Sequence, residues 1–226
     1  MSKTKKIKQK TTGFDIFYRV ITVIMTVAMY PLFYFKNILY FEIDHSTISD
    51  LLNSITGKNE TQVTYDYISI AGLPEWLDMI KSYLGDSADI NLDVFSNALY
   101  RPLIIAAAFI AVALVLGVII IGFALFSNKV KVIAALSGAG LACTIASYIS
   151  FTQFFAKPLI NGEITLSQLF NVQNTIVNMV LNLAGDVTVF RLEGAFFSVL
   201  FLLLAVFIWS VAVVIVNKIE EKENEK

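Results

Sequence analysis

The side chains that could do chemistry in this chain are few, and the densest group lies on one short segment. Glu42, Asp44, His45 and Asp50 are carboxylates and an imidazole, the groups that bind divalent cations. Asp44 and His45 are adjacent, however, and the spacing of the four residues matches no metal-binding template. With 1 His and 1 Cys, the chain also lacks the ligands of a zinc cluster or a Cys-x-x-Cys redox motif. We expect no metal, no cofactor and no catalytic residue.

Two stripes of uncharged polar side chains are the remaining candidates. Tyr18, Thr22 and Thr26 recur every fourth residue within an apolar segment. Helical hydroxyls can donate to the carbonyl of the preceding turn, so this stripe is either self-satisfied or the lining of a polar pathway. An amide stripe follows a capping box at Thr165 and Gln168 and predicts an amphipathic helix over 166–184. Its members are Asn171, Asn174, Asn178 and Asn182.

The amide stripe leaves three interpretations open. The helix 166–184 could pack on the outer surface or in the headgroup region, insert with its asparagines around a polar cavity, or contact a second copy of the chain. If it crosses the membrane, the chain has five crossings and its C-terminus lies outside.

The composition decides which elements must position these residues. The 226 residues are 57% apolar and 15% charged, with a mean hydropathy of +0.71, which is typical of an integral membrane protein. About 20 apolar residues span the roughly 30 Å hydrocarbon core as a helix. Four segments qualify, and the first, with its bulky exit sequence, is predicted to be a retained anchor rather than a cleaved signal peptide. The predicted spans are 14–36, 102–126, 132–151 and 194–216.

Small residues on three of these segments predict helix packing. Apolar burial gives helices little reason to associate in lipid, so close contact between small residues and interhelical hydrogen bonds must hold them together. The spacing of four or seven residues places each set on one helix face. The candidate packing residues are Ala134, Gly138, Ala142, Ala146, Ala113, Gly117, Ala205 and Ala212.

The basic residues predict the orientation, because Lys and Arg are retained on the cytoplasmic side. In a four-span arrangement, 11 of the 17 Lys and Arg residues lie on one side: in or beside the tail 1–13, in the turn 127–131 and in the tail 217–226. Both termini are therefore expected in the cytoplasm of a plasma-membrane protein. The outer loops are 37–101 and 152–193. The first loop is strongly acidic, and it predicts a strand over 62–70 within a mostly helical cap.

This layout resembles the claudin type of tetraspan protein, with termini inside, a large first outer loop and a smaller second one. Gly72-Leu73-Pro74-Glu75-Trp76 is similar to the claudin Gly-Leu-Trp element. The paired loop cysteines of that family are absent, so the resemblance covers layout alone.

The sequence thus predicts an all-α membrane protein: a four-helix transmembrane bundle under a small, mostly helical outer cap. We expect a non-enzymatic scaffold or complex subunit in the lipid bilayer that binds a protein partner through its outer loops, with no nucleic-acid partner. A channel or transporter subunit, assembled as a homo-oligomer around one of the polar stripes, is the alternative.

Overall fold

A computed structural model describes residues 13–44, 63–75, 98–127, 129–165, 168 and 186–224. The elements of these residues are α1 (Gly13–Phe35), β1 (Asn37–Asp44), β2 (Val63–Ser69), η1 (Ala98–Tyr100), α4 (Arg101–Phe126), α5 (Val130–Phe151), η2 (Thr152–Ala156), α6 (Lys157–Ile160), β3 (Asp186–Leu192) and α9 (Gly194–Asn224).

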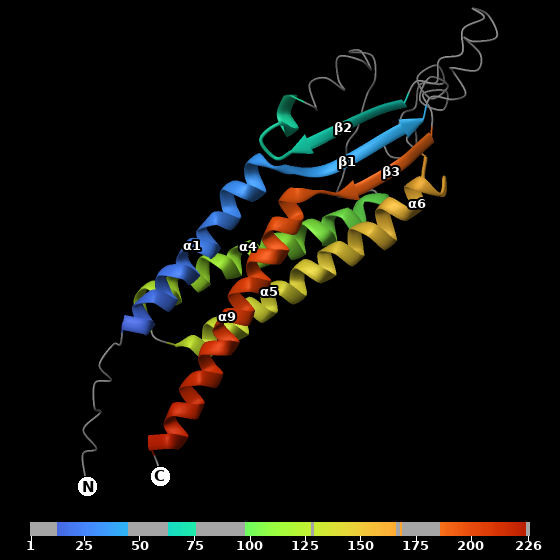
Figure 1. Cartoon of the computed structure of the whole chain (residues 1–226). Helices are drawn as coiled ribbons and strands as arrows, with labels where there is room; N and C mark the ends of the chain where they lie inside the picture. Colours follow the sequence, from blue (N-terminus) through green and yellow to red (C-terminus); the bar gives the residue numbers. More distant parts are fainter. Residues whose placement is uncertain are drawn as a thin grey trace, which may run out of the picture.

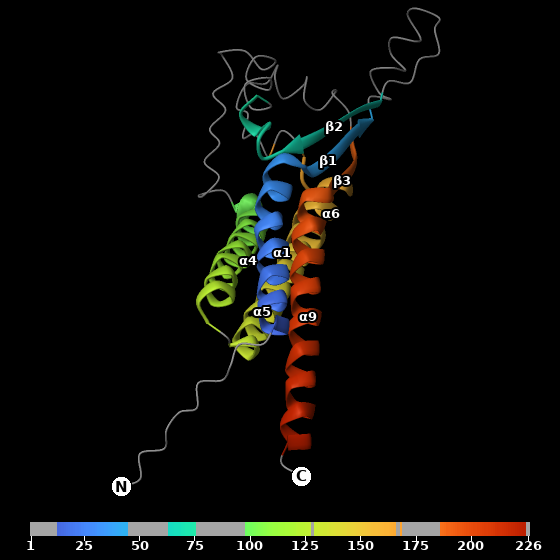
Figure 2. The same cartoon turned by 60° about the vertical axis from the view of Figure 1, so that its left-hand side comes forward.

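Four apolar helices make up most of the described part of the chain, as the hydropathy predicts. They are long and apolar enough to cross a membrane, over Gly13–Phe35, Ala98–Phe126, Val130–Ile160 and Gly194–Glu221. α4 packs along α5, α5 along α9, and α1 against both α4 and α9. The strands lie at one end of these helices, and the start of α1 and the end of α9 lie at the other (Figures 1 and 2).

The third apolar helix is longer than the predicted 132–151. α5 runs on through η2, a π-helical turn, and through α6 to Ile160. Pro158 accounts for the irregularity, because its ring would clash with the carbonyl of Phe154 in a regular α-helix, and a wider turn relieves that clash. The chain turns at Gly162, whose φ of 73° is costly for any residue with a Cβ atom.

The fourth helix also exceeds its prediction. α9 continues to Asn224, past the predicted limit of 216, so most of the segment expected as a tail is helical. The helix can continue because Lys and Glu are good helix formers. The charged side chains at this end, Lys218, Glu220 and Glu221, are exposed, so they do not require the helix to stop.

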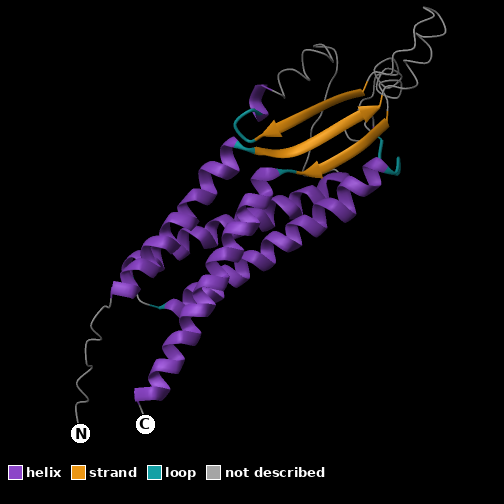
Figure 3. Cartoon of the chain, viewed as in Figure 1, coloured by secondary structure: helices purple, strands orange, loops and turns teal. Residues whose placement is uncertain are grey.

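The expectation of an all-α protein is wrong at the end of the helices away from the two termini, where the described residues form a three-stranded antiparallel sheet (Figure 3). The strand order is β2-β1-β3, so a strand directly after α1 pairs with one directly before α9. β2 matches the strand predicted over 62–70. The sequence does not predict β1 and β3, which are eight and seven residues long. Such short strands form because they pair with segments far away in the sequence, and their own residue pattern is too weak to indicate them.

One face of the sheet is apolar and lies on the ends of the helices. Leu39, Ile43, Val187, Phe190 and Leu192 share a hydrophobic cluster with the upper parts of α4, α5 and α9. The Phe190 ring packs at a tilt against the rings of Phe151 and Phe155, with centroids 5.2 and 5.9 Å apart. Side chains alternate along a strand, and a register shift between Glu42 and Ile43 brings Val187 to the same face as Phe190. The opposite face therefore carries Tyr40, Glu42 and Arg191.

Candidate functional site

The outward face of the sheet gathers polar aromatic and charged side chains from all three strands. In the register, Tyr40 on β1 lies opposite Tyr67 on β2 and Arg191 on β3. The rings of Tyr40 and Tyr67 are 4.8 Å apart, and the Arg191 guanidinium lies 4.8 Å from the centre of the Tyr40 ring. We call Tyr40, Glu42, Tyr67 and Arg191 the tyrosine face.

Hydrogen bonds hold the tyrosine face in place. The Tyr40 hydroxyl donates to Glu42 Oε2 over 3.0 Å, and Arg191 Nε donates to Glu193 Oε1 over 2.9 Å. Desolvation raises the pKa of Tyr40 above its usual 10.0, and the neighbouring Glu42 carboxylate raises it further. The phenol therefore stays protonated and remains a donor at neutral pH.

The hydroxyl stripe of α1 faces its own chain rather than an opening. Tyr18, Thr22 and Thr26 are 1%, 0% and 1% exposed. The Tyr18 hydroxyl shares a 2.8 Å hydrogen bond with Ser210 Oγ of α9, and Thr26 Oγ1 donates to the Thr22 carbonyl over 2.7 Å. Within the chain, Tyr18 therefore joins α1 to α9 and Thr26 bonds to its own helix, while the lining of a pathway between several copies stays a prediction.

Further hydrogen bonds cross between the helices. The Tyr30 hydroxyl donates to the Leu114 carbonyl over 2.8 Å, which links α1 to α4. Ser147 and Ser150 on α5 donate to the Ala106 and Pro102 carbonyls of α4, over 2.7 and 2.9 Å. In hydrocarbon such bonds favour one helix arrangement over others, because the alternative is an unpaired polar group.

The predicted packing residues divide into three groups. Ala113 and Gly117 are buried, with Gly117 against Met29 and Tyr30 of α1. Ala134, Gly138, Ala146 and Ala205 are half-buried, and Ala142 and Ala212 are exposed. The buried line of α5 instead contains Ser137, Gly140, Thr144 and Ser147, about half a turn away from Ala142. A broad face of small residues does not show which half is covered. On α5 the covered half includes Ser147 and Ser150, which donate to carbonyls of α4.

The other sequence candidates fall largely outside the described residues. Asn171, Asn174, Asn178 and Asn182 lie there, as do His45 and Asp50. The capping box itself is present: the Thr165 amide donates to Gln168 Oε1 over 3.0 Å, and the Gln168 amide donates to Thr165 Oγ1 over 3.3 Å.

Comparison of the chain with protein-family models, curated proteins and solved structures gave no match.

The tyrosine face was not predicted as a site. The sequence signal is the alternation of apolar and polar residues in NILYFEID and DVTVFRL. It can be recognised only once these two segments are known to pair. Chemically, the face offers two aromatic rings, a guanidinium and a carboxylate on a sheet supported from below. Tyr and Arg, together with Trp, are enriched among the residues that contribute most binding energy at protein interfaces.

Proposed function

We propose that the protein is a non-enzymatic subunit of a membrane complex, and that its tyrosine face binds a partner protein outside the membrane. The four helices would form a transmembrane bundle in the plasma membrane with both termini in the cytoplasm. The observation that carries the proposal is the tyrosine face itself, because Tyr40, Tyr67 and Arg191 come from three strands and are held together by a tilted ring contact and a cation–π contact.

The construction of the sheet supports a binding role. β1 and β2 come from the first outer loop and β3 from the second, so the sheet fixes both loops to each other and to the helix ends. Binding costs less free energy when the surface is already ordered. Tyr67 is 47% exposed and so presents its ring to a partner, while Tyr40 behind it is half-buried and braces it.

The helices support the same interpretation. Among the described residues, the buried hydroxyls of these helices other than Thr22 bond to a neighbouring helix or to their own preceding turn, which favours a structural body over a pathway. α6 also contacts β3, so the end of α6 and the start of β3 lie at the same end of the helices (Figure 1). An even number of crossings, with both termini on the opposite side, agrees with the charge distribution.

Site-specific photo-cross-linking in the native cell tests this function. A photoreactive phenylalanine analogue in place of Tyr67 should give one protein adduct of defined mass. The same analogue at Leu73, which is 40% exposed but lies outside the tyrosine face, is the matched control. Adding Tyr40→Ala should lower the Tyr67 adduct about tenfold or more, since anchor residues of this type contribute about 2 kcal/mol or more.

Two results would contradict the proposed function. One is the absence of an adduct at Tyr67 in cells that express the folded protein. The other is an adduct that forms equally well from Leu73 and is unchanged by Tyr40→Ala. Thermal unfolding of each variant in detergent separates a lost interface from a lost fold.

A further inference from the structure

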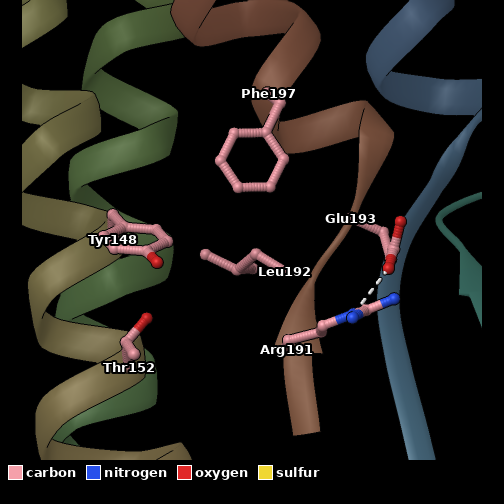
Figure 4. Close-up of a pocket in the computed structure, with 6 residues that line it drawn as sticks. All are labelled: Tyr148, Thr152, Arg191, Leu192, Glu193 and Phe197. Carbon is pink, nitrogen blue, oxygen red and sulfur yellow. Dashed lines mark hydrogen bonds and ion pairs between the residues drawn. The ribbon is translucent and has the colours of Figure 1, made fainter.

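A partly open cleft of about 250 Å³ lies where the sheet meets the helices. Tyr148 of α5 and Thr152 of η2 form one wall, Leu192 of β3 and Phe197 of α9 form the other, and Arg191 and Glu193 border it. Figure 4 shows Leu192 and Phe197 reaching toward Tyr148, while the Arg191 and Glu193 side chains turn to the opposite side of β3. The cleft shares Arg191 with the tyrosine face, but it lies on the other side of β3 from the Arg191 side chain.

The cleft lies at the outer boundary of the apolar helices. Phe197 belongs to the first turn of α9, where the apolar span begins. The Tyr148 ring is 6.1 and 6.2 Å from the rings of Phe196 and Phe197, so it lies at the same level. Tyrosines are enriched at this level of a bilayer, where the ring meets acyl chains and the hydroxyl meets polar headgroup atoms.

Among the residues that the structure describes, neither the Tyr148 nor the Thr152 hydroxyl makes a hydrogen bond. Other hydroxyls on the same helix do, since Thr144 donates back to Gly140 and Ser147 across to Ala106. Figure 4 places the Tyr148 and Thr152 oxygens on the same wall, turned toward the gap. A hydroxyl at the edge of hydrocarbon is more stable with an acceptor, and the cleft is open to one.

Below the cleft, exposed apolar side chains of α5 and α9 continue toward the membrane interior. Ile145 and Ile149 are 47% exposed on α5, and Phe201 is 62% exposed on α9. The rings of Phe197 and Phe201 are 6.5 Å apart, so the wall of the cleft passes directly into the surface that meets lipid. An occupant with a polar upper part and an apolar lower part fits this geometry.

The border of the cleft carries no net charge. The Arg191 guanidinium pairs with Glu193 at 2.9 Å, and these are the two charged residues among those that line the cleft. A paired border does not select a ligand by its charge.

We propose that this cleft binds one glycerolipid of the membrane through an ester carbonyl. The carbonyl accepts hydrogen bonds from the Tyr148 and Thr152 hydroxyls, and the acyl chain lies along Phe197 and Phe201. Because the border is neutral, the headgroup does not determine affinity. Lipid occupancy is independent of whether the tyrosine face binds a protein.

Native mass spectrometry of the purified full-length chain, stripped of lipid in detergent, tests the proposal. The chain is titrated with dioleoyl phosphatidylcholine and with its diether analogue, which lacks both carbonyls. We expect one retained ester lipid, at a concentration about tenfold below that needed for the diether, because two hydrogen bonds of about 0.6 kcal/mol each are lost. Phosphatidylglycerol should bind within about twofold of phosphatidylcholine.

In the double variant Tyr148→Phe/Thr152→Val, the ester lipid should bind with no higher affinity than the diether lipid. Tyr34→Phe is the matched control, since Tyr34 is a 49% exposed tyrosine at the outer end of α1, away from the cleft. A graded series of adducts without preference for the ester would mean ordinary surrounding lipid and overturn the proposal. Strong preference for the anionic headgroup, or unchanged binding by the double variant, would also overturn it. The ester and diether comparison uses the unmodified chain, so it decides the matter even if the double variant unfolds.

Discussion

At the scale of single residues, one buried hydroxyl has a partner and its neighbour one turn away does not. Tyr18 bonds to Ser210, whereas Thr22 Oγ1 and Trp209 Nε1 are the buried side-chain atoms without a partner in the described part of the chain. A bonded hydroxyl stabilises its helix pair, while an unbonded one costs desolvation free energy and returns nothing. The two positions should therefore respond in opposite ways to the loss of oxygen.

We predict that Tyr18→Phe lowers the free energy of unfolding and Thr22→Val does not. The double-mutant cycle of Tyr18→Phe with Ser210→Ala should give a coupling of about 0.6 kcal/mol, the usual size for interhelical hydrogen bonds in membranes. Thr22→Val keeps the shape of the side chain and should leave stability equal or higher. Unfolding in mixed micelles with increasing SDS measures the four proteins of the cycle and Thr22→Val. A loss on Thr22→Val as large as that on Tyr18→Phe would show that the Thr22 hydroxyl is bonded after all.

At the scale of helices, α1 and α4 approach where α4 has no side chain. A Cβ atom on Gly117 would lie 2.5 Å from Met29 Cε and 2.8 Å from the Tyr30 hydroxyl oxygen. The methionine end can move, but the tyrosine hydroxyl is held on the Leu114 carbonyl of the same helix. Gly122, five residues further on, has nothing within 4 Å of the same position. The missing side chain at Gly117 therefore allows α1 to contact α4, whereas Gly122 faces no neighbour within that distance.

Gly117→Ala should thus destabilise the protein and Gly122→Ala should not. Overpacking of this kind costs about 1–3 kcal/mol, against a gain of up to about 1 kcal/mol in helix propensity that both substitutions share. The difference between the two variants isolates the contact. Thermal unfolding in detergent measures it, and equal melting temperatures would mean that α1 and α4 are not packed at Gly117.

At the scale of the whole molecule, the apolar helices can be predicted from the sequence and the pairing of the strands cannot. Hydropathy alone predicts the four apolar helices, because lipid requires each of them to be long and apolar within its own segment. The sheet is different. β1 and β3 are separated by more than 140 residues along the chain, so neither Tyr40 nor Arg191 carries a local signal of the other. The tyrosine face and the cleft arise from this pairing and could not be predicted before it.

The topology of the whole chain gives the last prediction. If the four helices cross the membrane with the sheet outside, the turn after α6 is extracellular and both the α4–α5 turn and the end of α9 are cytoplasmic. The single cysteine, Cys143, lies within α5 and can be replaced by alanine, which leaves a background for single-cysteine labelling. Glu163→Cys should react with a membrane-impermeant maleimide on intact cells, because Glu163 is exposed at the outer end. Lys129→Cys and Glu221→Cys, exposed at the opposite end, should react only after permeabilisation. Labelling of both Glu221→Cys and Glu163→Cys on intact cells would mean that the chain crosses the membrane an odd number of times. The four-span topology would then no longer support an extracellular tyrosine face.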